Sequence, residues 1–171
     1  SHIFMDEKFY RFIVQVERLS GNCDILPVIV SEKLLYNNEI KVGDYVSIEG
    51  QIRTKNQKEN DRKRLLVFGY ALDIKKISKE EAEALENRNT IDLIGYVVKT
   101  PVYRETKTGR KITELLIASN RPYNKSDYIP SIAWGVESVY ARNFEVGDKV
   151  ELSGRFQSRD YIARDEHGNP I

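Results

Sequence analysis

Two large aromatic side chains stand close together in a segment with the composition of a β-strand. Tyr128 and Trp134 lie six residues apart in KSDYIPSIAWG, residues 125–135. Because successive side chains of a strand point to opposite faces, residues an even number apart share a face, and so do these two aromatics. Aromatics that point outward can stack on nucleic-acid bases, whereas inward ones pack a core. The segment therefore poses a choice between a binding face and a core.

Basic residues surround these aromatics in the sequence. The segment YRETKTGRK, residues 103–111, is predicted to be a basic hairpin loop with Gly109 in its turn. Cations of this kind can follow the phosphates of a single strand, although charge runs are also typical of a solvated surface. The candidate phosphate contacts are Arg104, Lys107, Arg110, Lys111, Arg121, Lys125, Arg155, Arg159 and Arg164.

The sequence contains no recognisable catalytic machinery. Cys23 is the only cysteine, and His2 and His167 are the only histidines. An internal disulfide and a thiolate-rich zinc site are therefore excluded, and no nucleophile stands beside a base. We predict that the protein is not an enzyme and binds neither a metal nor a cofactor. Cys23 is expected to be a small buried or half-buried residue.

The overall charge gives no general attraction to nucleic acid. The 171 residues include 27 Lys and Arg and 26 Asp and Glu, a formal net charge of +1, so any site for a polyanion depends on local arrangement. No apolar run approaches the roughly 18 residues of a membrane helix, and the N-terminus lacks the layout of a signal peptide. We expect a soluble, cytoplasmic protein with no membrane contact.

The elements that must position the aromatics belong to an internal repeat. Asp24-Ile-Leu-Pro27 aligns with Asp127-Tyr-Ile-Pro130, 103 residues further along. With one more residue inserted, Val42-Gly-Asp44 aligns with Val146-Gly-Asp148. Other blocks match in the same order, which indicates a tandem duplication of a unit of about one hundred residues. Alternating apolar runs between Gly-Asp and Asn-rich turns predict that each copy is a small, mostly β domain.

The two copies are joined by a helical segment and are each open at one seam. Ser78 is placed to cap a short helix with acids in its first turn. The predicted strand at residues 91–98 has no counterpart in the first copy, and the segment at residues 65–77 has none in the second. We expect an unpaired edge in each copy, which a longer chain or a partner would close. The predicted units are residues 1–77, the linker 78–88, and residues 89–171.

Four blocks of the second copy stand in a characteristic order and spacing: IDLIGYVV (91–98), LIASNR (116–121), DYIPSIAWG (127–135) and VGDKVELSGRFQSRDY (146–161). In these blocks the second copy resembles the bacterial single-stranded DNA-binding protein family, and the first copy is a diverged version similar to tandem two-domain members. The resemblance implies an all-β fold with two tandem OB-folds, each a five-stranded Greek-key barrel. It also implies sequence-tolerant binding of single-stranded DNA in replication, recombination or repair, a location at the nucleoid, and a dimer that presents four OB units.

The aromatic positions of the family transfer to this sequence one by one. They give Tyr123, Tyr128, Trp134 and Tyr161, and the repeat places Ser20, Ile25, Ser31 and Gln57 at the same positions in the first copy. Core positions should stay apolar in both copies, and Ser31 and Gln57 are poor core residues. We therefore predict that Tyr128 and Trp134 point outward, and that the first copy binds weakly or serves as a scaffold.

Two functions remain open at this point. The first is binding of single-stranded DNA, with replication or repair proteins as further partners. The alternative is a protein-interaction module of a primosomal or accessory kind, with little or no nucleic-acid binding, because OB-folds serve several ligand classes. RNA is also open, since stacking alone does not distinguish ribose from deoxyribose.

Overall fold

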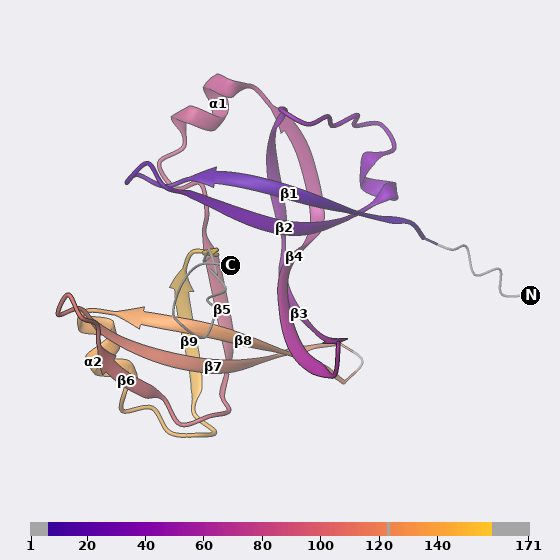
Figure 1. Cartoon of the computed structure of the whole chain (residues 1–171). Coiled ribbons are helices and arrows are strands. Elements are labelled where there is room, and N and C mark those ends of the chain that lie inside the picture. The colour runs from indigo at the N-terminus through magenta and orange to yellow at the C-terminus, as the bar shows by residue number, and fades with distance from the viewer. Residues whose placement is uncertain (1–6, 123, 159–171) are drawn as a thin grey trace, which may run out of the picture.

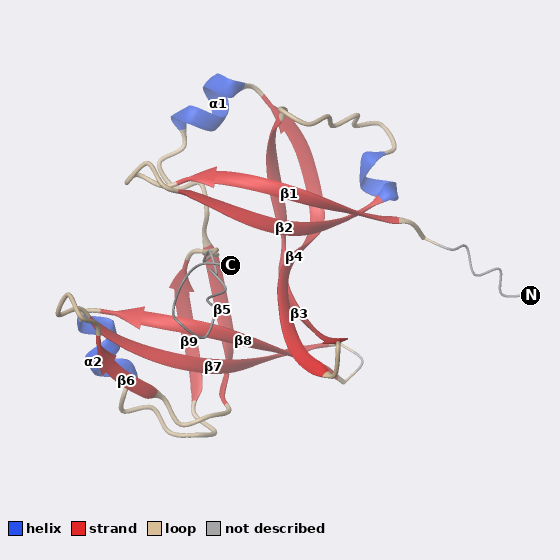
Figure 2. Ribbon diagram, viewed as in Figure 1, coloured by secondary structure: helices blue, strands red, loops and turns tan. Residues whose placement is uncertain are grey.

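The structure is a computed structural model that describes residues 7–122 and 124–158. Its two copies form two separate β-sheets, one above the other in Figure 1, and strands make up most of the chain in Figure 2. The expected all-β class is therefore confirmed. In the described part of the chain, no helix is long and apolar enough to cross a membrane.

The first copy is a four-stranded sheet in the order β1-β2-β4-β3. β1 is antiparallel to β2, β3 is antiparallel to β4, and β2 runs parallel to β4. The parallel pair forms because the chain crosses over after β2 instead of returning beside it. The elements are β1 (Phe9–Glu17), β2 (Cys23–Ser31), the 3₁₀ helix η1 (Glu32–Leu35), β3 (Tyr45–Glu59) and β4 (Arg62–Ile77).

The second copy has counterparts of β1, β2 and β3, which are β7, β8 and β9. Among the described residues it has no counterpart of β4, and it has two further strands, β5 and β6, before β7. β5 pairs with both β7 and β9, and β7 also pairs with β6 and β8, all antiparallel. The order is β6-β7-β5-β9, with β8 on β7. The elements are β5 (Ile91–Val97), β6 (Val102–Glu105), β7 (Lys111–Arg121), β8 (Lys125–Trp134), α2 (Val136–Ala141) and β9 (Lys149–Gly154).

Neither sheet closes within the described residues. The edges of the first sheet are β1 and β3, and those of the second are β6, β8 and β9. Both sheets thus have unpaired edge strands in this part of the chain.

Each copy has its own core on the inner face of its sheet. The first core contains Val28, Val30, Ala71 and Ile74, and the second contains Val97, Leu115, Ile117, Ala141 and Val150. Alternation along the strands explains both cores, because every second side chain points inward.

The strands pack most closely at two glycines. A Cβ on Gly50 would lie 2.1 Å from the Tyr70 carbonyl oxygen, and one on Gly95 would lie 2.4 Å from the Ala118 carbonyl oxygen. Only glycine lets the backbones approach this closely.

The predicted linker helix is α1 (Lys79–Ala84). Ser78 precedes it in an extended conformation, and its hydroxyl accepts a hydrogen bond from the backbone N–H of Glu81 at 3.1 Å. The cap therefore works as the sequence indicated.

The hairpin of β3 and β4 reaches from the first copy to the second, where it lies beside β8 (Figure 1). Its turn contains Asn60 and Asp61, both with positive φ, 48° and 62°. Such a left-handed pair is typical of tight hairpins and tolerates Asn and Asp. Residues 53–64, RTKNQKENDRKR, thus form a basic hairpin, and Thr54 near its open end contacts the other copy.

Candidate nucleic-acid interface

The outer face of β8 carries the aromatics predicted to bind. Tyr128 is 44% exposed and Trp134 is 40% exposed, whereas Asp127 and Ile129, the neighbours of Tyr128 in the strand, are buried. Pro130 and Ile132 share the outer face (residue exposure alternates along the strand). The outward orientation predicted for Tyr128 and Trp134 is therefore confirmed, and the choice posed by this strand is settled in favour of a surface.

Trp134 lies in a groove with four cations. The groove has a volume of about 730 Å³. The cations come from three places: the β6–β7 hairpin, the segment after β9, and the first copy. We call it the Trp134 groove; its lining residues are Arg18, Gly109, Arg110, Lys111, Trp134, Gly135, Arg155 and Gln157.

The β6–β7 hairpin presents two of these cations. Thr106 and Arg110 close its loop, with the Thr106 N–H donating to the Arg110 carbonyl at 2.8 Å. Gly109, at φ +82°, donates its N–H back to Thr106 at 2.9 Å. The position of Lys111 at the start of β7 is fixed by a backbone hydrogen bond. The Lys111 carbonyl accepts the N–H of Gly135, the residue directly after Trp134. The turn therefore holds a pair of cations beside the indole.

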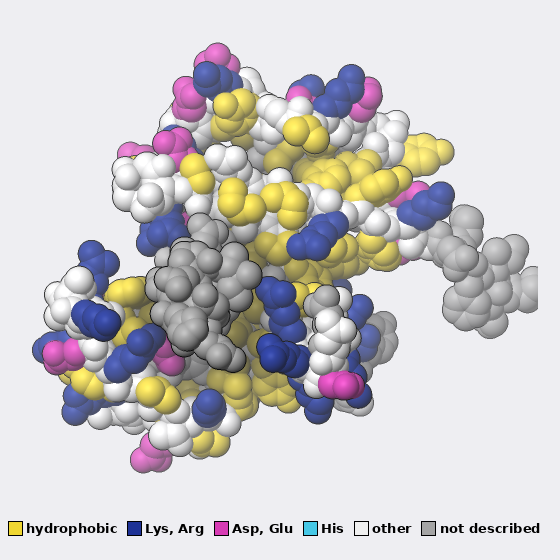
Figure 3. Space-filling model, in the orientation of Figure 1, with side chains coloured by type: hydrophobic (Ala, Val, Ile, Leu, Met, Phe, Trp, Pro, Cys, Tyr) yellow, Lys and Arg dark blue, Asp and Glu magenta, His cyan; other side chains and the backbone are white. Residues whose placement is uncertain are grey.

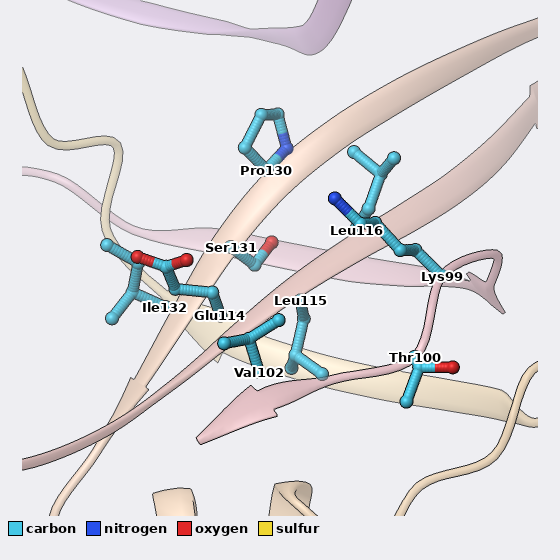
Figure 4. Close-up of a pocket in the computed structure, with 9 residues that line it drawn as sticks. All are labelled: Lys99, Thr100, Val102, Glu114, Leu115, Leu116, Pro130, Ser131 and Ile132. Atoms are coloured by element: carbon cyan, nitrogen blue, oxygen red, sulfur yellow. The ribbon is translucent and has the colours of Figure 1, made fainter. Parts of the chain in front are cut away.

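A second, more apolar hollow lies further along the same face (Figure 4). It has a volume of about 340 Å³. Val102, Leu116, Pro130 and Ile132 line it, with the Lys99 side chain at its edge. This hollow extends the surface of β8 away from Trp134 and can take an apolar group.

Two of the residues predicted to contact phosphate are paired with acidic side chains. Arg104 forms an ion pair with Glu114 at 2.8 Å, and the half-buried Arg121 has its Nε 2.8 Å from Asp127 Oδ2. Because these two charges have carboxylate partners, they offer less to a phosphate than a free cation does. Arg110, Lys111 and Arg155 line the Trp134 groove, and Lys107 and Lys125 are exposed at hairpin ends. The predicted contacts Tyr123, Arg159, Tyr161 and Arg164 lie outside the described residues.

The two copies contact each other through a pair of buried aspartates. Asp127 Oδ1 accepts the backbone N–H of Thr54 at 2.8 Å, and Tyr128 N–H donates to the Thr54 hydroxyl at 3.0 Å. Asp24 Oδ1 accepts the backbone N–H of Ser158 at 3.1 Å, and the Ile25 N–H donates to the Ser158 hydroxyl at 2.9 Å. The two contacts are thus reciprocal and use the same groups in both directions.

Arg18 links this contact to the groove. Its Nε and Nη2 donate to the two carboxylate oxygens of Asp24 at 2.9 and 2.5 Å. These hydrogen bonds hold the pKa of Asp24 below its usual range, more strongly than burial raises it, and the Ser158 N–H lowers it further. The carboxylate therefore stays ionised and fixes Arg18 at the wall of the Trp134 groove.

Sequence reasoning missed several of these residues. Arg18 lies 103 residues before Arg121, at the same place in the repeat, and it lines the groove although no sequence pattern assigned it to the site. Thr54 and Ser158 occupy the same place in the repeat and are both hydroxyl residues, a signal that was available. Tyr96 is a further exposed aromatic, at 41%, separated from Tyr128 by Ala118 in the register of β5, β7 and β8.

Two expectations for the first copy were wrong. Ser31, taken as a poor core residue, is buried, because its hydroxyl donates to Glu7 and caps η1 through the Lys33 N–H. Small polar residues are readily buried when their hydroxyl is satisfied. Cys23, expected to be buried or half-buried, is exposed and accepts a hydrogen bond from Gln15 at 3.1 Å.

Comparisons with known proteins point to one family. Residues 88–169 match the model of the single-strand binding protein family. The second copy belongs to the single-strand binding protein family. The single-stranded DNA-binding protein of Clostridium tetani (strain Massachusetts / E88) is 33% identical over 84 residues, which cover 45% of this chain and 58% of that protein. That of Caldanaerobacter subterraneus subsp. tengcongensis is 32% identical over 88 residues, 47% of this chain and 57% of that protein. The chain thus spans somewhat more than half the length of these relatives.

Solved structures of this family have the same fold across both copies. The wild-type single-stranded DNA binding protein from Thermus aquaticus has a TM-score of 0.68 at 17% identity, and covers 95% of this chain and 86% of that chain. A deletion mutant of the same protein has a TM-score of 0.66 at 19% identity, with 87% and 73% covered. At this identity the likeness shows the fold alone, and the predicted tandem OB-folds are confirmed.

Proposed function

We propose that this chain binds single-stranded DNA without sequence preference, with its strongest site in the Trp134 groove. The observation that carries the proposal is the arrangement of Arg110, Lys111 and Arg155 around one exposed indole. A base can stack on the indole while the cations hold the adjacent phosphates, which is how sequence-tolerant single-strand sites work. No step in this function requires a catalytic group, a metal or a cofactor.

The face of β8 extends the proposed site. Tyr128 gives a second stacking surface on the same side as Trp134, and the hollow lined by Pro130 and Ile132 lies between them along the strand. Figure 3 shows Lys and Arg side chains around the lower end of the β3–β4 hairpin, which lies beside this strand. The proposed path of the strand therefore runs along β8. Tyr123, Tyr161 and Arg159 belong to the proposal by resemblance only.

The experiment uses Trp134 as its reporter, because it is the only tryptophan. The protein is titrated with oligothymidine of about 20 to 35 nucleotides at low and high salt, with a duplex of equal length as control. Quenching by the single strand alone, weaker at high salt, is the expected result. An unchanged signal, together with no binding by anisotropy of the labelled oligomer, contradicts the proposal. Oligouridine in the same assay tests DNA against RNA.

A protein-interaction module is the second candidate, and the hollow of Figure 4 supports it. Val102, Leu116, Pro130 and Ile132 present apolar surface that an incoming side chain could cover. If the oligomers fail to bind, retention of a replication or repair protein by the immobilised chain, lost in Ile132→Asp, is the result that this candidate predicts.

Association of two chains, which would present four OB units, and a location at the nucleoid are further parts of the proposal. Analytical ultracentrifugation tests the first of these. A monomer at all concentrations contradicts it.

A further inference from the structure

The first copy has aromatics on its outer sheet face, although its aligned binding positions lack them. Tyr70 on β4 and Phe9 on β1 have ring centroids 6.2 Å apart, and the Arg53 guanidinium carbon lies 3.6 Å from the Tyr70 ring centroid. Phe9 is 46% exposed. The three side chains form one continuous surface of alternating planar groups.

The strand register places this surface on the side that OB-folds use for binding. Arg11 on β1 lies opposite Ile29 on β2, Ile29 opposite Tyr70, and Tyr70 opposite Gln51 on β3. Directly paired residues share a face, so Arg11 and Tyr70 point to the same side. β1 and β2 correspond in the repeat to β7 and β8, which carry the proposed site of the second copy. We call this surface the Phe9–Tyr70 face; it consists of Phe9, Arg11, Ile29, Arg53 and Tyr70.

The cations of the Phe9–Tyr70 face have no acidic partner among the residues that the structure describes. Neither Arg11 nor Arg53 forms an ion pair within 4 Å with an acid in the described part of the chain, and Lys55 and Arg64, further along the same face, form none there either. A protein partner would have to bring acids to match these cations, whereas a nucleic-acid strand brings a phosphate with every base. Planar groups beside free cations favour the nucleic acid.

Both copies place an arginine beside an aromatic by means of the same Arg–Gln pair, written in opposite order. In the first copy Gln51 Oε1 accepts from Arg53 Nε and Nη2 at 3.3 and 3.1 Å, next to Tyr70. In the second, Gln157 Oε1 accepts from Arg155 Nε at 3.4 Å, in the groove of Trp134. The repeat aligns Gln51 with Arg155 and Arg53 with Gln157. The chemistry is thus retained in the first copy although the positions have changed.

We propose that the Phe9–Tyr70 face is a second site for single-stranded nucleic acid, in which bases stack on Phe9 and on the Arg53 guanidinium that lies over the Tyr70 ring, while Arg11 contacts phosphate. Guanidinium planes accept stacked bases as aromatic rings do. The inference rests on the proposed function, since it gives the first copy a share in the same ligand. It replaces the expected scaffold role by direct contact, and a strand has to be long enough to reach both copies.

The first experiment moves the only tryptophan to the new face. In the full chain, Phe9→Trp is combined with Trp134→Phe, which keeps an aromatic in the groove, and the protein is titrated with oligothymidine of about 35 nucleotides. Quenching of the residue-9 indole is the expected result. An unquenched indole, while anisotropy shows that the same oligomer binds, overturns the inference and leaves the proposed function intact.

The second experiment compares two oligomer lengths. One OB unit covers about 4 to 16 nucleotides, so an oligothymidine of about 10 reports the Trp134 groove and one of about 35 reports both copies. The double variant Phe9→Ala with Arg53→Ala should bind the longer oligomer about 5-fold to 100-fold more weakly than the unchanged protein does. Its affinity for the shorter oligomer should fall by less than about 2-fold. The matched control is Tyr36→Ala with Lys41→Ala, an exposed aromatic and an exposed cation elsewhere in the first copy.

Three outcomes overturn the inference. Equal affinity of the double variant and the unchanged protein for the longer oligomer shows that the Phe9–Tyr70 face carries no strand. Altered sedimentation without altered affinity shows that the face joins protein chains instead. No binding of either oligomer by the unchanged protein removes the proposed function first, and this inference with it.

Discussion

Thr54 and Ser158 occupy the same position in the two copies, and each donates its backbone N–H to the buried aspartate of the other copy. Each hydroxyl in turn accepts the N–H of the residue that follows that aspartate. The two copies are therefore related by an approximate two-fold axis, with the reciprocal contacts of a symmetric dimer inside one chain. One half of this contact, Tyr128, belongs to the proposed binding face, so the packing of the copies and the position of the site are linked.

Removal of the Thr54 hydroxyl should destabilise the contact between the copies. Thr54→Val keeps the shape of the buried side chain but leaves the Tyr128 N–H without its acceptor. We expect a loss of about 1 to 3 kcal/mol in the free energy of unfolding, measured by urea denaturation. Ser126→Ala is the control, because its hydroxyl bonds the exposed Asn120 and should change stability by less than about 0.5 kcal/mol. Equal effects of the two variants would contradict the prediction.

Asp24 should make the stability depend on acid pH. Its pKa lies below the usual value because Arg18 and the Ser158 N–H bond the ionised form. A lowered pKa in the folded state means that the stabilisation is complete above the ordinary value, near pH 4, and is lost as the pH falls through the lowered pKa. Asp24→Asn should therefore be much less stable than the unchanged protein at pH 7, and the difference should narrow below about pH 4. A difference that stays constant from pH 7 to pH 2 in thermal melts would show that the charge is not responsible.

Single-strand binding should depend on free cations more than on paired ones. Lys111→Ala and Arg155→Ala each remove a cation of the Trp134 groove. The plot of log affinity against log salt has a negative slope, and each variant should make this slope shallower by about 0.7. Arg104→Ala removes a cation that Glu114 already neutralises, so its slope should barely change. The comparison is made by anisotropy of labelled oligothymidine over a salt series. A larger change for Arg104 than for Lys111 would refute the proposed path.

Trp134 itself should supply most of the stacking energy of its groove. Trp134→Ala is expected to cost about 1 to 3 kcal/mol of binding free energy, because one base loses its platform. Tyr140→Ala provides a matched control, since Tyr140 is an aromatic on α2 that is 72% exposed and does not line the groove. Calorimetry with oligothymidine measures both. If Tyr140→Ala weakens binding as much as Trp134→Ala, the strand follows another surface.

Gly95 should not tolerate a methyl group. Its Cβ would lie 2.4 Å from the Ala118 carbonyl oxygen and 2.6 Å from Ile117, so β5 and β7 would have to separate. We expect Gly95→Ala to lower the free energy of unfolding by about 1 to 3 kcal/mol, seen as a lower melting temperature. Gly154→Ala, whose Cβ would meet nothing within 4 Å, should melt within a few degrees of the unchanged protein. Similar melting of both variants would mean that the strands are not this close.

Much of the fold could be predicted because strand alternation and turn residues are local signals. The alternation along residues 125–134 placed Tyr128 and Trp134 on one face, and the comparison of the two copies predicted that this face points outward. Ser78 gave the start of the linker helix. The burial of Ser31 and the exposure of Cys23 could not be predicted in the same way. They depend on what packs over the two ends of β2, and alternation within the strand does not specify those contacts.

The sequence by itself determined the duplication, the strands, and the aromatic and basic residues of the second copy, since each follows from periodicity, composition or alignment over short distances. Only the tertiary structure decided which cations surround Trp134, that Arg18 comes to them from the other copy, and that Phe9, Tyr70 and Arg53 meet on one face. These residues are brought together by β-pairing and by contacts between the copies. Such contacts join positions that are well separated in the sequence, by more than fifty residues for Phe9 and Tyr70. Their geometry is set by the twist and register of whole sheets rather than by any local pattern.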